Sequence, residues 1–144
     1  MSITKTTQVT KGADIQRGWH HIDVAGKNLG RTSTEIAQYL MGKSKSYFVR
    51  NLDCGDYVVV TNAQDVAVTG KKEEKKEYFR YSGYPNGLSS ETLGKLRMRR
   101  PEEIIRRSVR GMLPQNKLRD RMLKRLFVYA GSEHPYQEKL KNKN

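Results

Sequence analysis

Cysteine is almost absent from this sequence of 144 residues: Cys54 is the only one, and histidine occurs three times. A single cysteine cannot form an intramolecular disulfide, and a chain without paired cysteines lacks the usual ligands of a structural zinc site. His20 and His21 are adjacent in a predicted strand, so their side chains point to opposite faces and cannot converge on one metal ion. We therefore expect no metal, no cofactor and a reducing compartment, the cytoplasm.

Long apolar runs are missing as well. No stretch approaches the ~20 residues that a membrane span requires, and the N-terminus lacks the apolar block of a secretory signal. We expect no membrane partner. The chain is expected to form a flexible polar arm at residues 1–18, a single domain at residues 19–130 and a polar tail at residues 131–144.

Acidic residues are scarce where basic residues are dense. The chain has 28 Lys and Arg against 15 Asp and Glu, a formal net charge of +13. Residues 19–70 contain five charges of each sign, whereas residues 95–125 contain 12 basic and 3 acidic residues. Solubilising charge would spread over the whole surface. This concentration instead indicates one electropositive face and a polyanionic partner.

The first half of the chain predicts strands separated by a helix. Trp19–Ala25 has the composition of a strand, and a helix capped by Asn28 is expected to reach Met41 before stopping at Gly42. Tyr57–Thr61 (YVVVT) is a continuous β-branched run, which suits an interior strand covered on both faces.

Two shorter runs, Val66–Thr69 and Leu126–Tyr129, are expected to add strands, and the mixed-sign run Lys71–Glu77 is expected to be a solvated loop or strand end. These elements predict an α/β fold. We expect a compact three-layer α/β/α domain with a small, mostly parallel central sheet, basic C-terminal helices and loose tails.

The basic segment predicts two short amphipathic helices. Pro101 followed by two glutamates favours a helix start, and on a helical wheel the apolar residues from Ile104 on lie opposite the three arginines of residues 106–110. Gly111 is expected to end or bend this helix and Pro114 to prevent its smooth continuation, so that the chain turns a corner there. A second helix should start near Asn116. Arg119 is a misfit in its apolar arc, so either its side chain snorkels to the surface or the helix starts later.

Two sites invite a catalytic interpretation. Gly26–Thr32 superficially resembles a P-loop, but three residues instead of four separate its glycines, and Arg31 replaces the motif's lysine. Close helix-to-strand packing at Gly30 explains the glycines better. Asp53 and Asp56 could form an acid/base pair, although a turn stabilised by Asp side chains is the favoured explanation.

Tyr78–Gly87 (YFRYSGYPNG) interleaves aromatic residues with Arg80 and turn formers. This composition occurs where bases or riboses stack on rings. It fits a tyrosine-bearing strand entering a Pro-Asn-Gly turn equally well, and both can hold at once.

Motifs along most of the chain match one known family. The most specific is Val109–Pro114 (VRGMLP). The others are Trp19, Asp23, Leu29–Arg31, Gly42–Lys43, Gly55–Asp56, Asn62–Ala63, Thr69–Gly70, Arg80, Gly83–Pro85, Gly87, Pro101, Leu118, Tyr129–Gly131 and Glu133–Pro135. Over about residues 15–136 the chain resembles the universal large-subunit ribosomal protein family numbered thirteen, in its bacterial form.

This resemblance implies a compact α/β/α fold embedded in large-subunit ribosomal RNA, neighbouring large-subunit proteins as partners, a role in subunit assembly and no catalysis. The sequence departs from the family pattern at Arg50, Asn51, Tyr81, Asn86 and Tyr136. At Asn51, Tyr81 and Tyr136 it lacks histidines that the family commonly has.

We therefore expect a structural RNA-binding protein of the cytoplasmic ribosome, without a small-molecule substrate. The expected RNA-binding residues are Arg31, Lys43, Lys45, Arg80, Tyr84, Arg97, Arg99, Arg100, Arg106, Arg107, Arg110, Lys117, Arg121 and Lys124. The alternatives are a small nucleotide-dependent enzyme that uses the Gly26–Thr32 loop and a DNA-binding protein, which shares the charge pattern.

Overall fold

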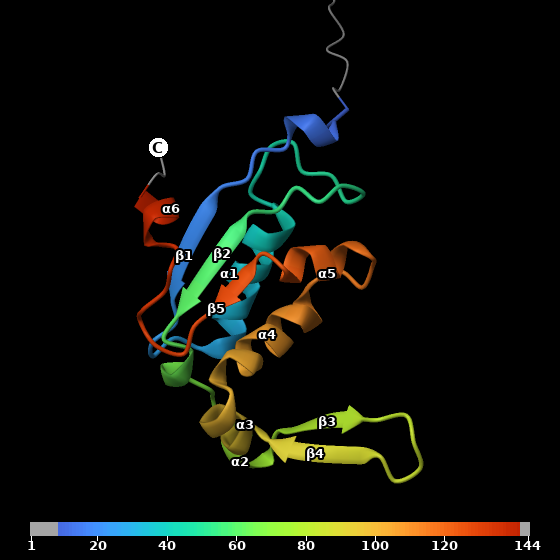
Figure 1. The fold of residues 1–144 in the computed structure, drawn as a ribbon, viewed down its shortest axis with the longest axis vertical. Helices are drawn as coiled ribbons and strands as arrows, with labels where there is room; N and C mark the ends of the chain where they lie inside the picture. The colour runs from blue at the N-terminus through green and yellow to red at the C-terminus, as the bar shows by residue number, and fades with distance from the viewer. Residues whose placement is uncertain (1–8, 142–144) are drawn as a thin grey trace, which may run out of the picture.

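A three-stranded parallel sheet forms the centre of the computed structural model, which describes residues 9–141 (Figure 1). Its strands are β1 (Trp19–Asp23), β2 (Tyr57–Thr61) and β5 (Leu126–Val128), in the order β1-β2-β5. Trp19 pairs with Tyr57, and Val58 pairs with Leu126. The predicted interior strand is therefore confirmed, since β2 lies in the middle.

The main hydrophobic core lies between one face of the sheet and two helices, α1 (Leu29–Met41) and α4 (Pro101–Met112). Alternate strand residues such as Val58 and Val60 point into this core and are fully buried. In Figure 1, α1 lies behind the sheet.

The predicted helix start and stop of α1 are confirmed. Its first turn is capped by the Asn28 side chain, which accepts a hydrogen bond from the Gly30 amide at 3.0 Å. The helix ends where Gly42 adopts a left-handed conformation with φ 77°.

The third layer is thin and comes from the C-terminal segment. On the opposite face of the sheet, the Trp19 ring stacks on Tyr57 at 4.5 Å and contacts the Tyr136 ring at 5.1 Å between centroids. A short helix, α6 (Gln137–Lys141), follows Tyr136 and lies beside β1 (Figure 1). Residues 1–8 of the expected arm and residues 142–144 of the expected tail lie outside the described range.

A separate hairpin projects from the body of the molecule beside three helical segments (Figure 1). It consists of the antiparallel strands β3 (Glu77–Tyr81) and β4 (Leu88–Thr92). The neighbouring helices are α2 (Lys72–Lys75), α3 (Leu93–Arg99) and the start of α4. The sequence predicted the first strand and the turn, but not β4, α2 or α3.

Two further details of the sequence interpretation are wrong. The expected strand at Val66–Thr69 is reduced to an isolated parallel bridge between Ala67 and Asn28. Gly111 does not end its helix: α4 continues to Met112, and the chain turns extended at Leu113, the residue before Pro114. The following helix, α5, spans Leu118–Leu123 and starts close to the expected Asn116.

The short turns at Gly12–Asp14 and Ala63–Asp65 are 3₁₀ helices, η1 and η2. Among the helices of residues 9–141, none has the length and apolar character to span a membrane.

Candidate RNA-binding surface

Two adjoining hollows separate the β3–β4 hairpin from α3, α4 and α5. Their volumes are about 640 and 560 Å³, and Tyr78, Arg80, Glu103 and Arg107 line both. We call this surface the basic groove. The cationic residues that line it are Arg80, Lys95, Arg99, Arg100, Arg106, Arg107 and Arg110. Three acidic residues line it as well, namely Glu91, Glu103 and Asp120.

The amphipathic pattern of α4 explains why its arginines reach the groove. Ile104, Ile105 and Val109 are at most 1% exposed and pack into the core. Arg106 and Arg110 come from the opposite side of the helix and are exposed. The predicted opposition of apolar and arginine arcs is confirmed.

Tyr78 forms the floor of the groove. The Arg107 guanidinium lies 5.1 Å from the centre of its ring, a cation–π geometry that orients the arginine. Burial raises the pKa of the Tyr78 hydroxyl, although the charge of Arg107 acts in the opposite direction. Tyr78 is therefore neutral at physiological pH, and it can donate a hydrogen bond into the groove.

The ion pairs inside the groove are exposed to solvent, and two of them are long. Arg99 contacts Glu91 at 2.6 Å, but 62% of its side chain remains accessible. Glu103 lies 4.0 Å from Arg106 and 3.7 Å from Arg107. Exposed pairs of this kind contribute little stability, so a phosphate can replace these carboxylates as the partner of the guanidinium groups.

Several expected contact residues lie on other parts of the surface. Lys117, Arg121 and Lys124 extend the cationic surface along α5 and its flanks, and all three are exposed. Arg31 is exposed in the first turn of α1, Lys43 is exposed just after α1, and Tyr84 is 75% exposed in the hairpin loop.

Arg97 is turned away from the groove. Its Nε lies 3.0 Å from a Glu73 carboxylate oxygen, and its Nη1 donates to the Gln64 carbonyl at 3.4 Å. This side chain therefore braces α3 against α2 and the turn at η2.

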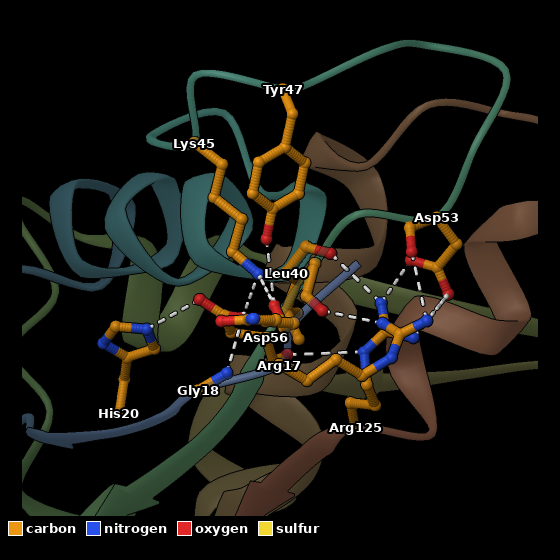
Figure 2. A network of polar contacts seen from close by, with 11 residues as sticks. Arg17, Gly18, His20, Leu40, Lys45, Tyr47, Asp53, Asp56 and Arg125 are labelled. Atoms are coloured by element: carbon orange, nitrogen blue, oxygen red, sulfur yellow. Dashed lines mark hydrogen bonds and ion pairs between the residues drawn. The ribbon is translucent and has the colours of Figure 1, made fainter. Parts of the chain in front are cut away.

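Lys45, one of the expected RNA-binding residues, is paired inside the molecule. Its ammonium group donates to the Asp56 carboxylate and to the Gln16 carbonyl, each at 2.5 Å, and its side chain is only 14% exposed. Figure 2 shows the side chain pointing inward toward Asp56. Lys45 therefore ties the loop after α1 to the residue that precedes β2.

Arg125 is a buried structural cation that the sequence interpretation did not single out. It is buried and forms a bidentate ion pair with both carboxylate oxygens of Asp53 (Figure 2). It also donates to the backbone carbonyls of Leu40 and Asp56. Gly55 permits this arrangement, because a Cβ there would lie 1.7 Å from the Leu40 carbonyl oxygen.

Asp56 anchors the other half of this network. It accepts hydrogen bonds from the His20 ring at 2.9 Å and from the Gly18 amide at 2.8 Å, in addition to Lys45. Burial alone would raise its pKa, but these hydrogen bonds and the lysine charge outweigh burial and hold the pKa at about 2. Asp53 and Asp56 both bind cations from other segments of the chain, instead of stabilising the local turn that the sequence suggested.

The Gly26–Thr32 loop uses its amides internally. The amides of Gly26 and Leu29 donate to the carbonyls of Asp65 and Ala67, each at 2.9 Å. The Gly30 amide is bonded to the Asn28 side chain. A P-loop must present such amides to phosphate, so this geometry does not support the nucleotide-dependent enzyme. Across residues 9–141, no three His, Cys, Asp or Glu side chains cluster in a way that could hold a metal ion.

Comparisons with known proteins agree on one family. A family model described as "Ribosomal protein L13" matches residues 17–135. The large ribosomal subunit protein uL13 of Dehalococcoides mccartyi strain BAV1 is 49% identical over 130 residues, which cover 90% of this chain and 91% of that protein. The protein of the same name from Geobacillus kaustophilus is 49% identical over 92% of both chains, and that from Aquifex aeolicus is 50% identical over 88% of both.

Proposed function

Because this chain belongs to the ribosomal protein L13 family, we propose that it is a structural constituent of the large ribosomal subunit. In the cytoplasmic ribosome it binds large-subunit ribosomal RNA, contacts neighbouring large-subunit proteins and supports subunit assembly. It performs no catalysis.

The observation that carries this proposal is the gathering of seven cationic side chains around one groove. A phosphate backbone in the groove would be met by several guanidinium groups at once, which is the geometry that neutralises a polyanion. Because charged and polar residues make up most of the lining of the groove, it suits a nucleic-acid strand better than an apolar small molecule.

The RNA-contacting residues follow from this geometry as a proposal. Within the groove they are Arg80, Lys95, Arg99, Arg100, Arg106, Arg107 and Arg110. A flanking set consists of Lys117, Arg121 and Lys124, and the outlying contacts are Arg31, Lys43 and Tyr84. Lys45 and Arg97 are not included, because carboxylates occupy both.

Sedimentation of cell lysate tests the function directly. Tagged protein should travel with large subunits in a sucrose gradient, and the variant Arg100→Gln/Arg106→Gln/Arg110→Gln should shift substantially to the top of the gradient. A protein that never enters the large-subunit fractions would contradict the proposed function. Competition for the purified protein between duplex DNA and large-subunit ribosomal RNA decides between RNA and DNA as the preferred ligand.

A matched charge control exists within the chain. Lys27, Lys71 and Lys75 are exposed and line neither hollow of the groove. Replacing these three by Gln removes the same charge and should leave co-sedimentation largely intact.

A further inference from the structure

The hairpin has an outer face that carries exposed aromatic side chains. Tyr81 pairs with Leu88 across the two strands, and Phe79 lies two residues before Tyr81. Since alternate residues of a strand point to opposite faces, Phe79, Tyr81 and Leu88 share one face, while Tyr78 and Arg80 share the other. The three side chains are 64%, 65% and 63% exposed, respectively.

This face is not covered by the rest of the described chain. Within residues 9–141, β3 and β4 pair only with each other and form a two-stranded sheet apart from the central one. Figure 1 shows the hairpin extending away from the main body. Neighbouring exposed apolar side chains commonly mark an interaction site, so we expect this face to contact another molecule.

Charge and position decide which partner fits. Phe79 also lines the basic groove, beside Arg106 and Arg110. A polyanion held by those arginines therefore runs past the edge of the aromatic face. In RNA, the groups that lie next to the phosphates and present flat apolar surfaces are the bases.

We propose that Phe79 and Tyr81 stack on unpaired nucleobases of the RNA strand that occupies the basic groove. This inference rests on the proposed RNA-binding function and assigns the hairpin a separate part of it. Phosphate contacts from the groove position the strand, and the two rings bind the bases of that strand.

The spacing of the rings supports this assignment. Two residues of a strand span about 6.6 Å, which is about twice the 3.4 Å rise per nucleotide of a stacked strand. Neighbouring bases can therefore reach both rings only in an unpaired segment whose bases are splayed out of their own stack. Paired bases cannot, because the duplex hides their faces within its own stack.

Leu88 provides a matched control on the same face. It is as exposed as the two rings, but it has no aromatic surface. If the face bound an apolar protein surface, Leu88→Ala should weaken the interaction about as much as loss of either ring. If the face stacks on bases, Leu88→Ala should have little effect on RNA binding.

The test measures binding of the full-length protein to protein-free large-subunit ribosomal RNA and to a fully paired RNA duplex. The double variant Phe79→Leu/Tyr81→Leu should lose affinity for the ribosomal RNA by at least about tenfold, since each aromatic–base stack contributes about fivefold or more and two stacks are lost. The ring-retaining variant Phe79→Tyr/Tyr81→Phe should bind like the wild type. The slope of log affinity against log salt should stay unchanged, because no phosphate contact is lost.

Two results would overturn the assignment. One is equal affinity of wild type and double Leu variant for the ribosomal RNA. The other is an equal loss of affinity for the paired duplex, which has no free base faces. Failure of the wild type to bind ribosomal RNA at all would instead contradict the proposed function, so the two failures can be told apart.

Discussion

Asp53 and Asp56 lie three residues apart and hold Arg125 and Lys45 inside the molecule. Removing either carboxylate would leave a buried cation unpaired, which costs more than the ion pair itself contributes. The same two residues therefore decide which cations can face RNA. Arg125 and Lys45 serve the fold, and the arginines of α4 remain available for the groove.

The depressed pKa of Asp56 predicts an acid-dependent stability. Its ordinary pKa is 3.8 and its value in the folded protein is about 2. Because the folded value is the lower one, the carboxylate stabilises the protein above pH 4, and this contribution is lost as the pH falls toward 2. At neutral pH it amounts to about 2 kcal/mol. Asp56→Asn should lower the free energy of unfolding by at least this amount at pH 7, because Lys45 also loses its partner, and by progressively less between pH 4 and 2.

Urea unfolding followed by the fluorescence of Trp19, the only tryptophan, measures this difference. Asp65→Asn, which removes an exposed carboxylate, serves as the control. A difference between wild type and Asp56→Asn that stays constant from pH 7 to pH 2 would contradict the assigned pKa.

At the scale of helices and strands, the glycines near the ends of α4 and α1 differ in what the backbone requires of them. Gly111 lies within the helix, and a Cβ built there meets no atom within 4 Å. Gly42 is different, because its φ of 77° is left-handed and a Cβ there would lie 2.5 Å from the Cys54 carbonyl oxygen. The fold therefore requires glycine at position 42 but not at position 111.

Gly111→Ala should accordingly raise the free energy of unfolding by about 0.5–1 kcal/mol, since alanine loses less backbone entropy in a helix. Gly42→Ala should lower it clearly. Thermal denaturation of the two variants provides the comparison. A destabilised Gly111→Ala protein would show that the chain needs a bend at this position, as the sequence alone suggested.

Elements with strong local signals could be predicted from the sequence. The β-branched run of β2 and the Asn28 and Gly42 caps of α1 specify their elements without help from distant contacts. In contrast, β4 (LSSET) is polar and exists because it pairs with β3, while α3 contributes only Leu93 and Leu96 to the core. Neither element has a pattern that a short stretch of sequence would reveal.

The residues of the candidate site show the same contrast between local and long-range signals. The arginines of α4 could be assigned to the surface because helical periodicity places them opposite buried isoleucines. Lys45 could not, since its partner lies 11 residues away, and the ion pair of Arg125 spans 72 residues. Charge density predicts that a basic face exists, but only tertiary contacts decide which of its members are already paired.

At the scale of the whole molecule, a nearly neutral sheet domain supports one strongly cationic face. The core packs against the inner sides of α1 and α4, and the third layer is limited to the segment around Tyr136 and α6. The excess of positive charge is concentrated in residues 95–125, which form α3, α4 and α5. This separation lets the protein gain affinity for RNA without weakening its own core.

The salt dependence of RNA binding tests this account most directly. Affinity of the full-length protein for large-subunit ribosomal RNA is measured between 50 and 300 mM KCl. Replacing Arg100, Arg106 and Arg110 by Gln should reduce the slope of log affinity against log salt by about two to three, because three phosphate contacts are lost. The control that replaces Lys27, Lys71 and Lys75 should keep the wild-type slope. Equal slopes for all three proteins, or a loss confined to the control, would contradict the assignment of the basic groove as the RNA-binding surface.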